Sequence, residues 1–180
     1  GVAGLIAGAM SMGAGEYVSV SSQHDAEKAD LTREADELRR NPKSELAELT
    51  GIYLQRGLEP GLAAQVAAQL MAKDALKAHA RDELGLSEAT SARPLQATFA
   101  SAAAFTLGAA PPLIIALLAP QSLVVASIAV TSMVVLAILG AVGAKIGGAP
   151  MMTAVIRVTF WGAFAMGLTA GIGHIFGAVV

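Results

Sequence analysis

The sequence predicts an all-α integral membrane helical bundle with a polar three-helix domain inserted after the first span. Hydrophobic residues make up 54% of the 180 residues, and charged residues make up 14%. Soluble domains carry roughly 25% charged residues, so this chain is unusually poor in charge. Aromatic residues contribute only 4%, which indicates helices packed through small and aliphatic side chains. The charges are also segregated, because 13 of the 14 acidic residues lie between Asp25 and Glu88.

Four apolar segments are long enough to cross a membrane, at about 20 residues per helix. The first is residues 1–23, which precedes the polar block 24–93. The other three lie within residues 94–180 and cover residues 95–119, 121–144 and 149–178. Pro111 and Pro112 should kink the second span or end its regular part. The first span begins at the start of the chain and lacks the positive region of a signal peptide, so we expect a fragment.

Positive charges predict the orientation of the spans. The block 24–93 and the turn 145–150 lie on one side of the membrane if four spans alternate, and both carry Lys or Arg. The turn 119–122 on the other side carries neither. The positive-inside rule therefore predicts that the polar block is cytoplasmic. Glycine pairs such as Gly4 and Gly8 suit close helix packing, either within one bundle or at a dimer seam.

The polar block is expected to form three helices, at residues 24–40, 43–56 and 60–84. Asn41 is a suitable N-cap for the second helix, with Pro42 at its first position. Gly57 and Gly85 are expected just after the second and third helices. An apolar face on the third helix is predicted from Leu62, Val66, Leu70 and Leu76.

Three pairs of potential metal ligands recur in the polar block at helical spacing. Two are glutamate pairs three residues apart and one is a His–Glu pair four residues apart, so each pair shares a helix face. Carboxylates suit Mn²⁺ and imidazole suits Fe²⁺ and Zn²⁺, so the clustered pairs would suit a divalent ion. The alternative is a solvated helix face with Glu–Lys and Glu–Arg pairs. The pairs are Glu34 and Glu37, Glu45 and Glu48, and His79 and Glu83.

A polar stripe also runs along the predicted first span, where Met12, Glu16, Ser19 and Gln23 follow helical spacing. An ionisable residue within a membrane costs about 2.5 kcal/mol or more and suggests a functional site. A thioether, a carboxylate, a hydroxyl and an amide on one face would suit a path for a cation. The alternative is that Glu16 snorkels to the lipid headgroups.

Several classes of chemistry are excluded or unsupported by the sequence. The absence of cysteine excludes disulfides, thiolate metal sites and cysteine nucleophiles. There is no Glu-x-x-His, no His-Glu-x-x-His and no Walker loop, so we predict no enzyme and no prosthetic group. No basic aromatic surface indicates nucleic-acid binding.

Three stretches carry a family resemblance: SMGAGEYVSVSSQ at 11–23, IYLQRGL at 52–58 and HARDELGL at 79–86. Together with the acidic helices they resemble the vacuolar iron transporter family, as a bacterial-type member with a cytoplasmic metal-binding domain. The resemblance covers essentially the whole chain. It implies a five-span homodimer in a bacterial inner membrane that moves Fe²⁺, and often Mn²⁺, out of the cytosol in exchange for protons. It also implies that a first span with an Asp-Gly motif precedes Gly1.

The resemblance implies roles for individual residues. Met12 and Glu16 match the transport path, whereas His79 occupies a place where a family member can carry Met. A membrane-anchored metal sensor or buffer remains an alternative, using the same glutamates without a path. The glutamates that match ligands of the cytoplasmic metal-binding domain are Glu34, Glu37, Glu45, Glu48 and Glu83.

Overall fold

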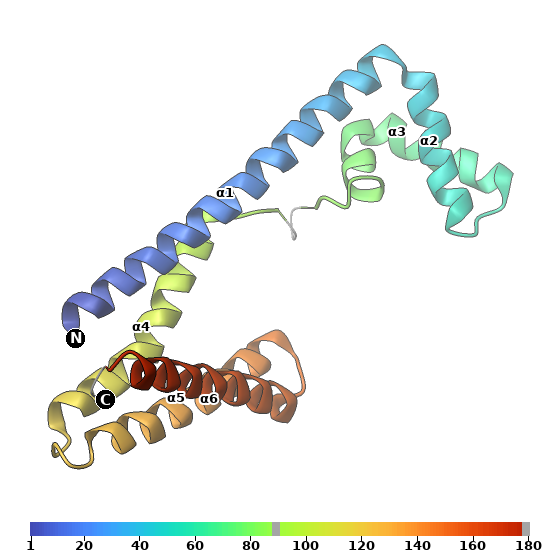
Figure 1. Ribbon diagram of the computed structural model, residues 1–180. Helices are drawn as coiled ribbons and strands as arrows, with labels where there is room; N and C mark the ends of the chain where they lie inside the picture. The colour runs from blue at the N-terminus through green and yellow to red at the C-terminus, as the bar shows by residue number, and fades with distance from the viewer. Residues whose placement is uncertain (88–90, 178–180) are drawn as a thin grey trace. The chain divides into compact units, whose positions relative to one another are not determined.

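The computed structural model describes residues 1–87 and 91–177, and all the regular secondary structure in these residues is helical. This confirms the predicted all-α class. The chain divides into two compact units, one of Gly1–Ala14 with Thr98–Val180 and one of Gly15–Ala97. Residues 88–90 of the predicted polar block and residue 178 of the predicted last span lie outside the described residues. The helices are α1 (Val2–Arg40), α2 (Pro42–Gln55), α3 (Pro60–Asp82), α4 (Pro94–Leu118), α5 (Val124–Gly147) and α6 (Met151–Ile175) (Figure 1).

Helix α1 is continuous over 39 residues, whereas the sequence predicts two separate segments at residues 1–23 and 24–40. No glycine or proline lies between Glu16 and Arg40, so nothing in that stretch interrupts the helix. The helix ends at Arg40, as predicted for the first helix of the polar block. Pro42 then occupies the first turn of α2, as predicted, although the Asn41 side chain makes no capping hydrogen bond.

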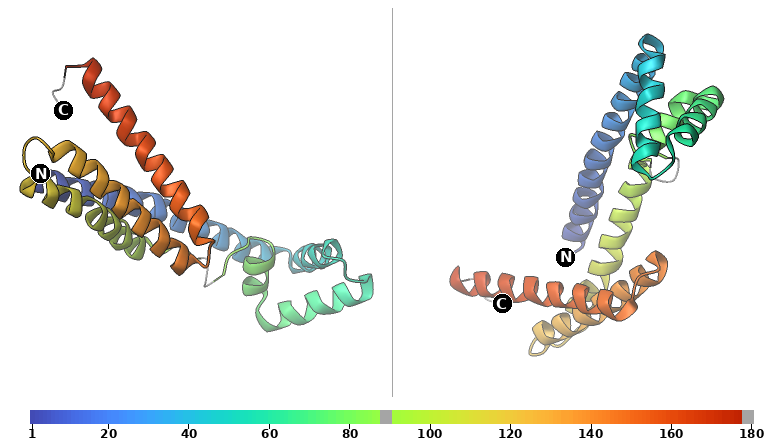
Figure 2. Two further views of the ribbon diagram at one scale, coloured as in Figure 1. Left: turned by 90° about the horizontal axis from the view of Figure 1, so that it is seen from below. Right: turned by 90° about the vertical axis from the view of Figure 1, so that its right-hand side faces the viewer.

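Helices α4, α5 and α6 are long and apolar enough to cross a membrane, judged by length and composition. Among the described residues α1 does not meet the same criterion, so a span at residues 1–23 stays a prediction. Helix α4 continues through Pro111 and Pro112, so these prolines do not end it. Helices α5 and α6 pack against each other (Figure 2).

Close packing explains two glycines in the unit that contains these helices, against backbone at Gly140 and against a side chain at Gly8. A Cβ at Gly140 of α5 would lie 3.2 Å from the Cα of Val155 in α6. A Cβ at Gly8 of α1 would lie 2.2 Å from the Cζ of Phe105 in α4, while one at Gly4 would meet nothing within 4 Å. Of the predicted glycine pair, Gly8 therefore serves packing within the chain.

The core of the other unit lies between α2 and α3. Leu49 and Tyr53 of α2 are buried against alanines of α3, while Val66 and Leu70 pack at the edge. The predicted face of α3 is partly wrong, because Leu62 is 52% exposed. The alanines allow the backbones of α2 and α3 to approach closely. The buried face of α3 is therefore shifted by one residue from the predicted face. These alanines are Ala63, Ala67 and Ala78.

Helix α3 changes direction at Asp74, whose backbone is extended at φ −166° and ψ 94°. The Asp74 carboxylate accepts a hydrogen bond from the backbone N–H of Lys77 at 3.0 Å. This is the contact of an N-cap residue, so Asp74 begins a second helical stretch within α3. Gly85, with φ 68°, follows the end of α3 as predicted.

Candidate metal centre

Helices α1 and α3 bring three potential metal ligands together in the unit Gly15–Ala97. Glu34 projects from α1, His79 lies in the last turn of α3, and Glu83 directly follows that helix. One ligand atom from each of these three residues lies within 4.8 Å of the others. Glu34 is 2% exposed and His79 is fully buried, so most of the cluster is shielded from water.

The imidazole of His79 lies between the two carboxylates. Its Nδ1 atom is 2.9 Å from Oε2 of Glu83 and 3.0 Å from Oε1 of Glu34. The contact with Glu34 is close but lacks hydrogen-bond geometry, so this buried oxygen has no hydrogen-bond partner among the described residues. An unsatisfied buried polar atom costs about 1–3 kcal/mol. A cation held by the two carboxylates and Nδ1 would satisfy it, so the donor set fits a divalent metal ion.

Electrostatics in the cluster also favour a cation. Burial raises the pKa of the Glu34 carboxyl, and the charge of Glu83 raises it further, while His79 opposes the change. Burial likewise raises the pKa of Glu45, with repulsion from Glu48 as the next cause. Each of these carboxylates is costly to ionise without a positive partner. A divalent ion would remove both the desolvation cost and the mutual repulsion.

The other predicted ligands surround the cluster less closely. Glu45 is buried in the first turn of α2, and its pKa responds to Glu37, Glu48 and Glu83, which places all three within electrostatic range. Glu37 and Glu48 are exposed. The structure therefore brings Glu34, His79 and Glu83 into one ligand set and leaves Glu37, Glu45 and Glu48 as nearby carboxylates.

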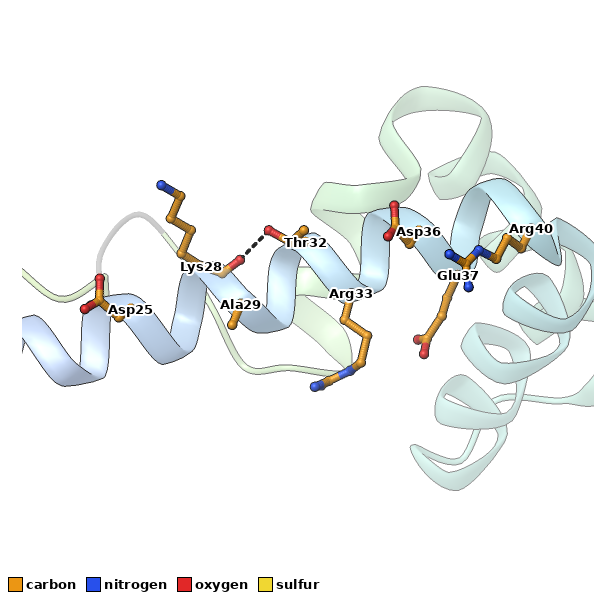
Figure 3. A pocket seen from close by; sticks show the side chains of 8 residues that line it. All are labelled: Asp25, Lys28, Ala29, Thr32, Arg33, Asp36, Glu37 and Arg40. Atoms are coloured by element: carbon orange, nitrogen blue, oxygen red, sulfur yellow. Dashed lines mark hydrogen bonds between the residues drawn. The ribbon is translucent and has the colours of Figure 1, made fainter.

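Glu37 also borders a shallow hollow of about 570 Å³ on the surface of α1 (Figure 3). Its charged residues are three acids and three bases, which is typical of a solvated helix face. Within this hollow the alternative of a solvated face therefore describes α1 better than a ligand site does. The hollow is lined by Asp25, Lys28, Ala29, Thr32, Arg33, Asp36, Glu37 and Arg40.

The predicted path residues lie further back along α1. Met12 and Glu16 are one helical turn apart and therefore share a face. Both side chains are exposed, with Met12 at 51%.

A hydrogen-bond network around the Asp82 carboxylate, beside the metal ligands, was not predicted from the sequence. The Asp82 carboxylate accepts hydrogen bonds from the Tyr53 hydroxyl at 2.6 Å and from the guanidinium groups of Arg56 and Arg81, each at 2.7 Å. Burial alone would raise the pKa of Asp82, but these hydrogen bonds outweigh it and hold the pKa well below its usual range. Tyr53 and Arg56 are three residues apart within IYLQRGL, which was the available signal. Their partner lies 26 residues beyond Arg56 along the chain, so spacing alone could not identify it.

Comparison with known proteins agrees with the resemblance seen in the sequence. The model of the VIT family matches residues 1–174. The "Vacuolar iron transporter" of Acanthamoeba castellanii is 49% identical over 175 residues, covering 97% of this chain and 67% of that protein. The "Vacuolar iron transporter 1" of Arabidopsis thaliana is 34% identical over 169 residues, covering 92% of this chain and 67% of that protein. The chain therefore belongs to the VIT family.

Proposed function

We propose that the chain is part of a transporter that carries Fe²⁺, and also Mn²⁺, out of the cytosol in exchange for protons. The observation that carries this proposal is the Glu34–His79–Glu83 cluster, in which Glu34 and His79 are buried, in a chain that also has three helices apolar enough to cross a membrane. The names of the relatives, vacuolar iron transporters, support iron as the cargo. Transport of an ion needs no covalent chemistry, so an enzymatic activity is not part of the proposal.

In the first stage, the polar block 24–93 captures the ion in the cytoplasm. Glu34, His79 and Glu83 supply two kinds of ligand atom, carboxylate oxygen and imidazole nitrogen, which Mn²⁺ and Fe²⁺ accept. The neighbouring carboxylates attract divalent cations and raise their concentration near the centre. They are Glu37, Glu45 and Glu48.

In the second stage, the ion crosses the membrane along a path in a homodimer. Met12 and Glu16 share a face of α1, where a thioether and a carboxylate would replace some of the waters around the ion. A carboxylate binds a metal ion only when it is deprotonated. Alternate binding of metal and proton at Glu16 would therefore couple export to proton entry. The relatives are named vacuolar, so the bacterial inner membrane stays a prediction from the sequence.

Uptake of Fe²⁺ into proteoliposomes tests this path. We expect Glu16→Ala to abolish uptake and Met12→Ala to slow it, while both variants still bind metal in the polar block. Met10→Ala is the matched control, because Met10 is an exposed methionine on a different face of the same helix. Unchanged uptake by Glu16→Ala would remove the path and favour a membrane-anchored metal sensor or buffer.

A further inference from the structure

The second stretch of α3 forms a short arm that carries metal ligands. We define the ligand arm as residues 75–83, which follow the break at Asp74 and include His79 and Glu83. Asp74 caps the start of the arm by accepting the Lys77 N–H. Because the helix is broken at Asp74, the first part of α3 does not by itself fix the direction of the arm.

On the side that faces α1, the arm contacts Glu34 through His79 but is not packed along its whole length. A cavity of about 880 Å³ lies there, lined by Glu27 and Leu31 of α1 and by Asp74, Lys77 and Arg81 of α3, among others. Among the described residues of this unit, the helices whose backbones pack closely are α2 and α3. Contacts to α2 help to hold the arm in place, and Ala78 of the arm lies in the core that α2 and α3 share.

The strongest of these contacts meet at Asp82, whose side chain is only 4% exposed. Tyr53 of α2 and Arg56, which directly follows that helix, donate hydrogen bonds to its carboxylate at 2.6 and 2.7 Å. Arg56 also donates to the backbone carbonyl of Asp82 at 3.1 Å and lies over the Tyr53 ring, 5.5 Å from its centroid. Arg56 thus contacts both the side chain and the backbone of Asp82. We call Tyr53, Arg56 and Asp82 the Asp82 clamp.

The clamp lies immediately beside the metal ligands. Glu83 follows Asp82 directly in the chain, and its N–H donates to the carbonyl of His79 at 2.9 Å. The two neighbouring carboxylates have different partners: Asp82 binds α2, whereas Glu83 lies 2.9 Å from the imidazole of His79. Fixing the backbone at Asp82 therefore fixes the direction in which Glu83 projects.

From this arrangement we infer that the Asp82 clamp positions His79 and Glu83 against Glu34 for binding of a divalent cation. Tyr53, Arg56 and Asp82 are positioning residues, and none of them contacts the ion. A metal site loses affinity when its ligands are held less accurately, and residues that support ligands are commonly worth about 10- to 100-fold in affinity. The inference rests on the proposed metal centre.

Binding of Co²⁺ to the full chain in detergent tests the clamp, because the visible absorption of Co²⁺ reports its ligand geometry. We expect Asp82→Asn and Tyr53→Phe each to raise the Kd for Co²⁺ about tenfold and to change the absorption bands at saturation. Asp25→Asn and Tyr17→Phe are matched controls at exposed positions and should leave the Kd and the absorption bands unchanged. Tyr53→Phe keeps the packed ring, so it still tests the positioning role of the clamp if Asp82→Asn does not fold.

Two other outcomes have distinct meanings. If both clamp variants melt at a lower temperature but keep the wild-type Kd and absorption bands, the clamp is only structural and the inference is overturned. If the unaltered chain binds no Co²⁺, the proposed metal centre itself fails, whatever the variants do.

Discussion

Replacing Glu34 by glutamine should have opposite effects on the metal-free and metal-bound protein. Glu34 is 2% exposed, and burial and the charge of Glu83 both raise the pKa of its carboxyl. A raised pKa means that, at pH values above the ordinary pKa, ionisation of this carboxylate lowers the stability of the folded protein. Glutamine has nearly the same shape and no charge. At pH 7.5 without metal, we therefore expect Glu34→Gln to be more stable than the wild type.

With metal present, the same substitution should remove most of the stabilisation. An ion at 100 times its Kd stabilises the folded state by about 2.7 kcal/mol. Glu34 supplies one of the three clustered ligand atoms. Loss of a residue that only supports a ligand weakens metal binding by about 10- to 100-fold, so loss of a ligand itself should raise the Kd about 100-fold or more. At the same ion concentration the stabilisation then falls to about 0.4 kcal/mol. For a domain of about 70 residues, this difference is about 10 °C or more in Tm.

Thermal unfolding of the full chain in detergent, with and without Mn²⁺, measures both effects. Glu59→Gln is the matched control, because Glu59 is an exposed glutamate outside the cluster and should respond to Mn²⁺ like the wild type. An equal rise in Tm with Mn²⁺ in Glu34→Gln and in the wild type would refute Glu34 as a ligand. A lower Tm of the metal-free variant would refute the electrostatic reasoning.

Two further predictions concern stability. The folded pKa values of Glu34 and Glu45 are raised above 4.5, so the stability of the metal-free protein should rise as pH falls through these values toward 4.5. Below about pH 4 the stability should fall, because the pKa of Asp82 is lowered in the folded state and its contribution is lost as it is protonated. Urea titrations at several pH values measure both effects. Gly8→Ala should destabilise the protein by about 1–3 kcal/mol, because the new methyl group would overlap Phe105, whereas Gly4→Ala should be tolerated. Thermal melting in detergent compares the two variants, and equal Tm values would contradict the packing of Gly8 against Phe105.

Local features of the polar block could be predicted from the sequence. Proline and glycine have strong backbone preferences, so Pro42 and Gly57 marked the start of α2 and the turn after it. The helical spacing of His79 and Glu83 also placed them on one face. These features depend on residues that are close in the chain.

Features that depend on distant residues were not predictable in the same way. The break at Asp74 is a local exception: it occurs in a stretch of helix-forming residues without glycine or proline, where the Asp74 carboxylate accepts a hydrogen bond from the backbone N–H of Lys77. The role of Asp82 depends on Arg56, 26 residues away. The meeting of Glu34 with His79 depends on how α1 lies against the end of α3. The sequence supplied the ligand types, and the fold selected which of them meet.

Fe²⁺ uptake into proteoliposomes with and without a pH gradient tests the central proposal most directly. If a carboxylate exchanges metal for proton, vesicles with an acidic interior should accumulate Fe²⁺ faster than vesicles without a gradient, and collapse of the gradient should remove the difference. Equal uptake under both conditions would contradict proton antiport. No uptake above that of protein-free vesicles would contradict transport itself.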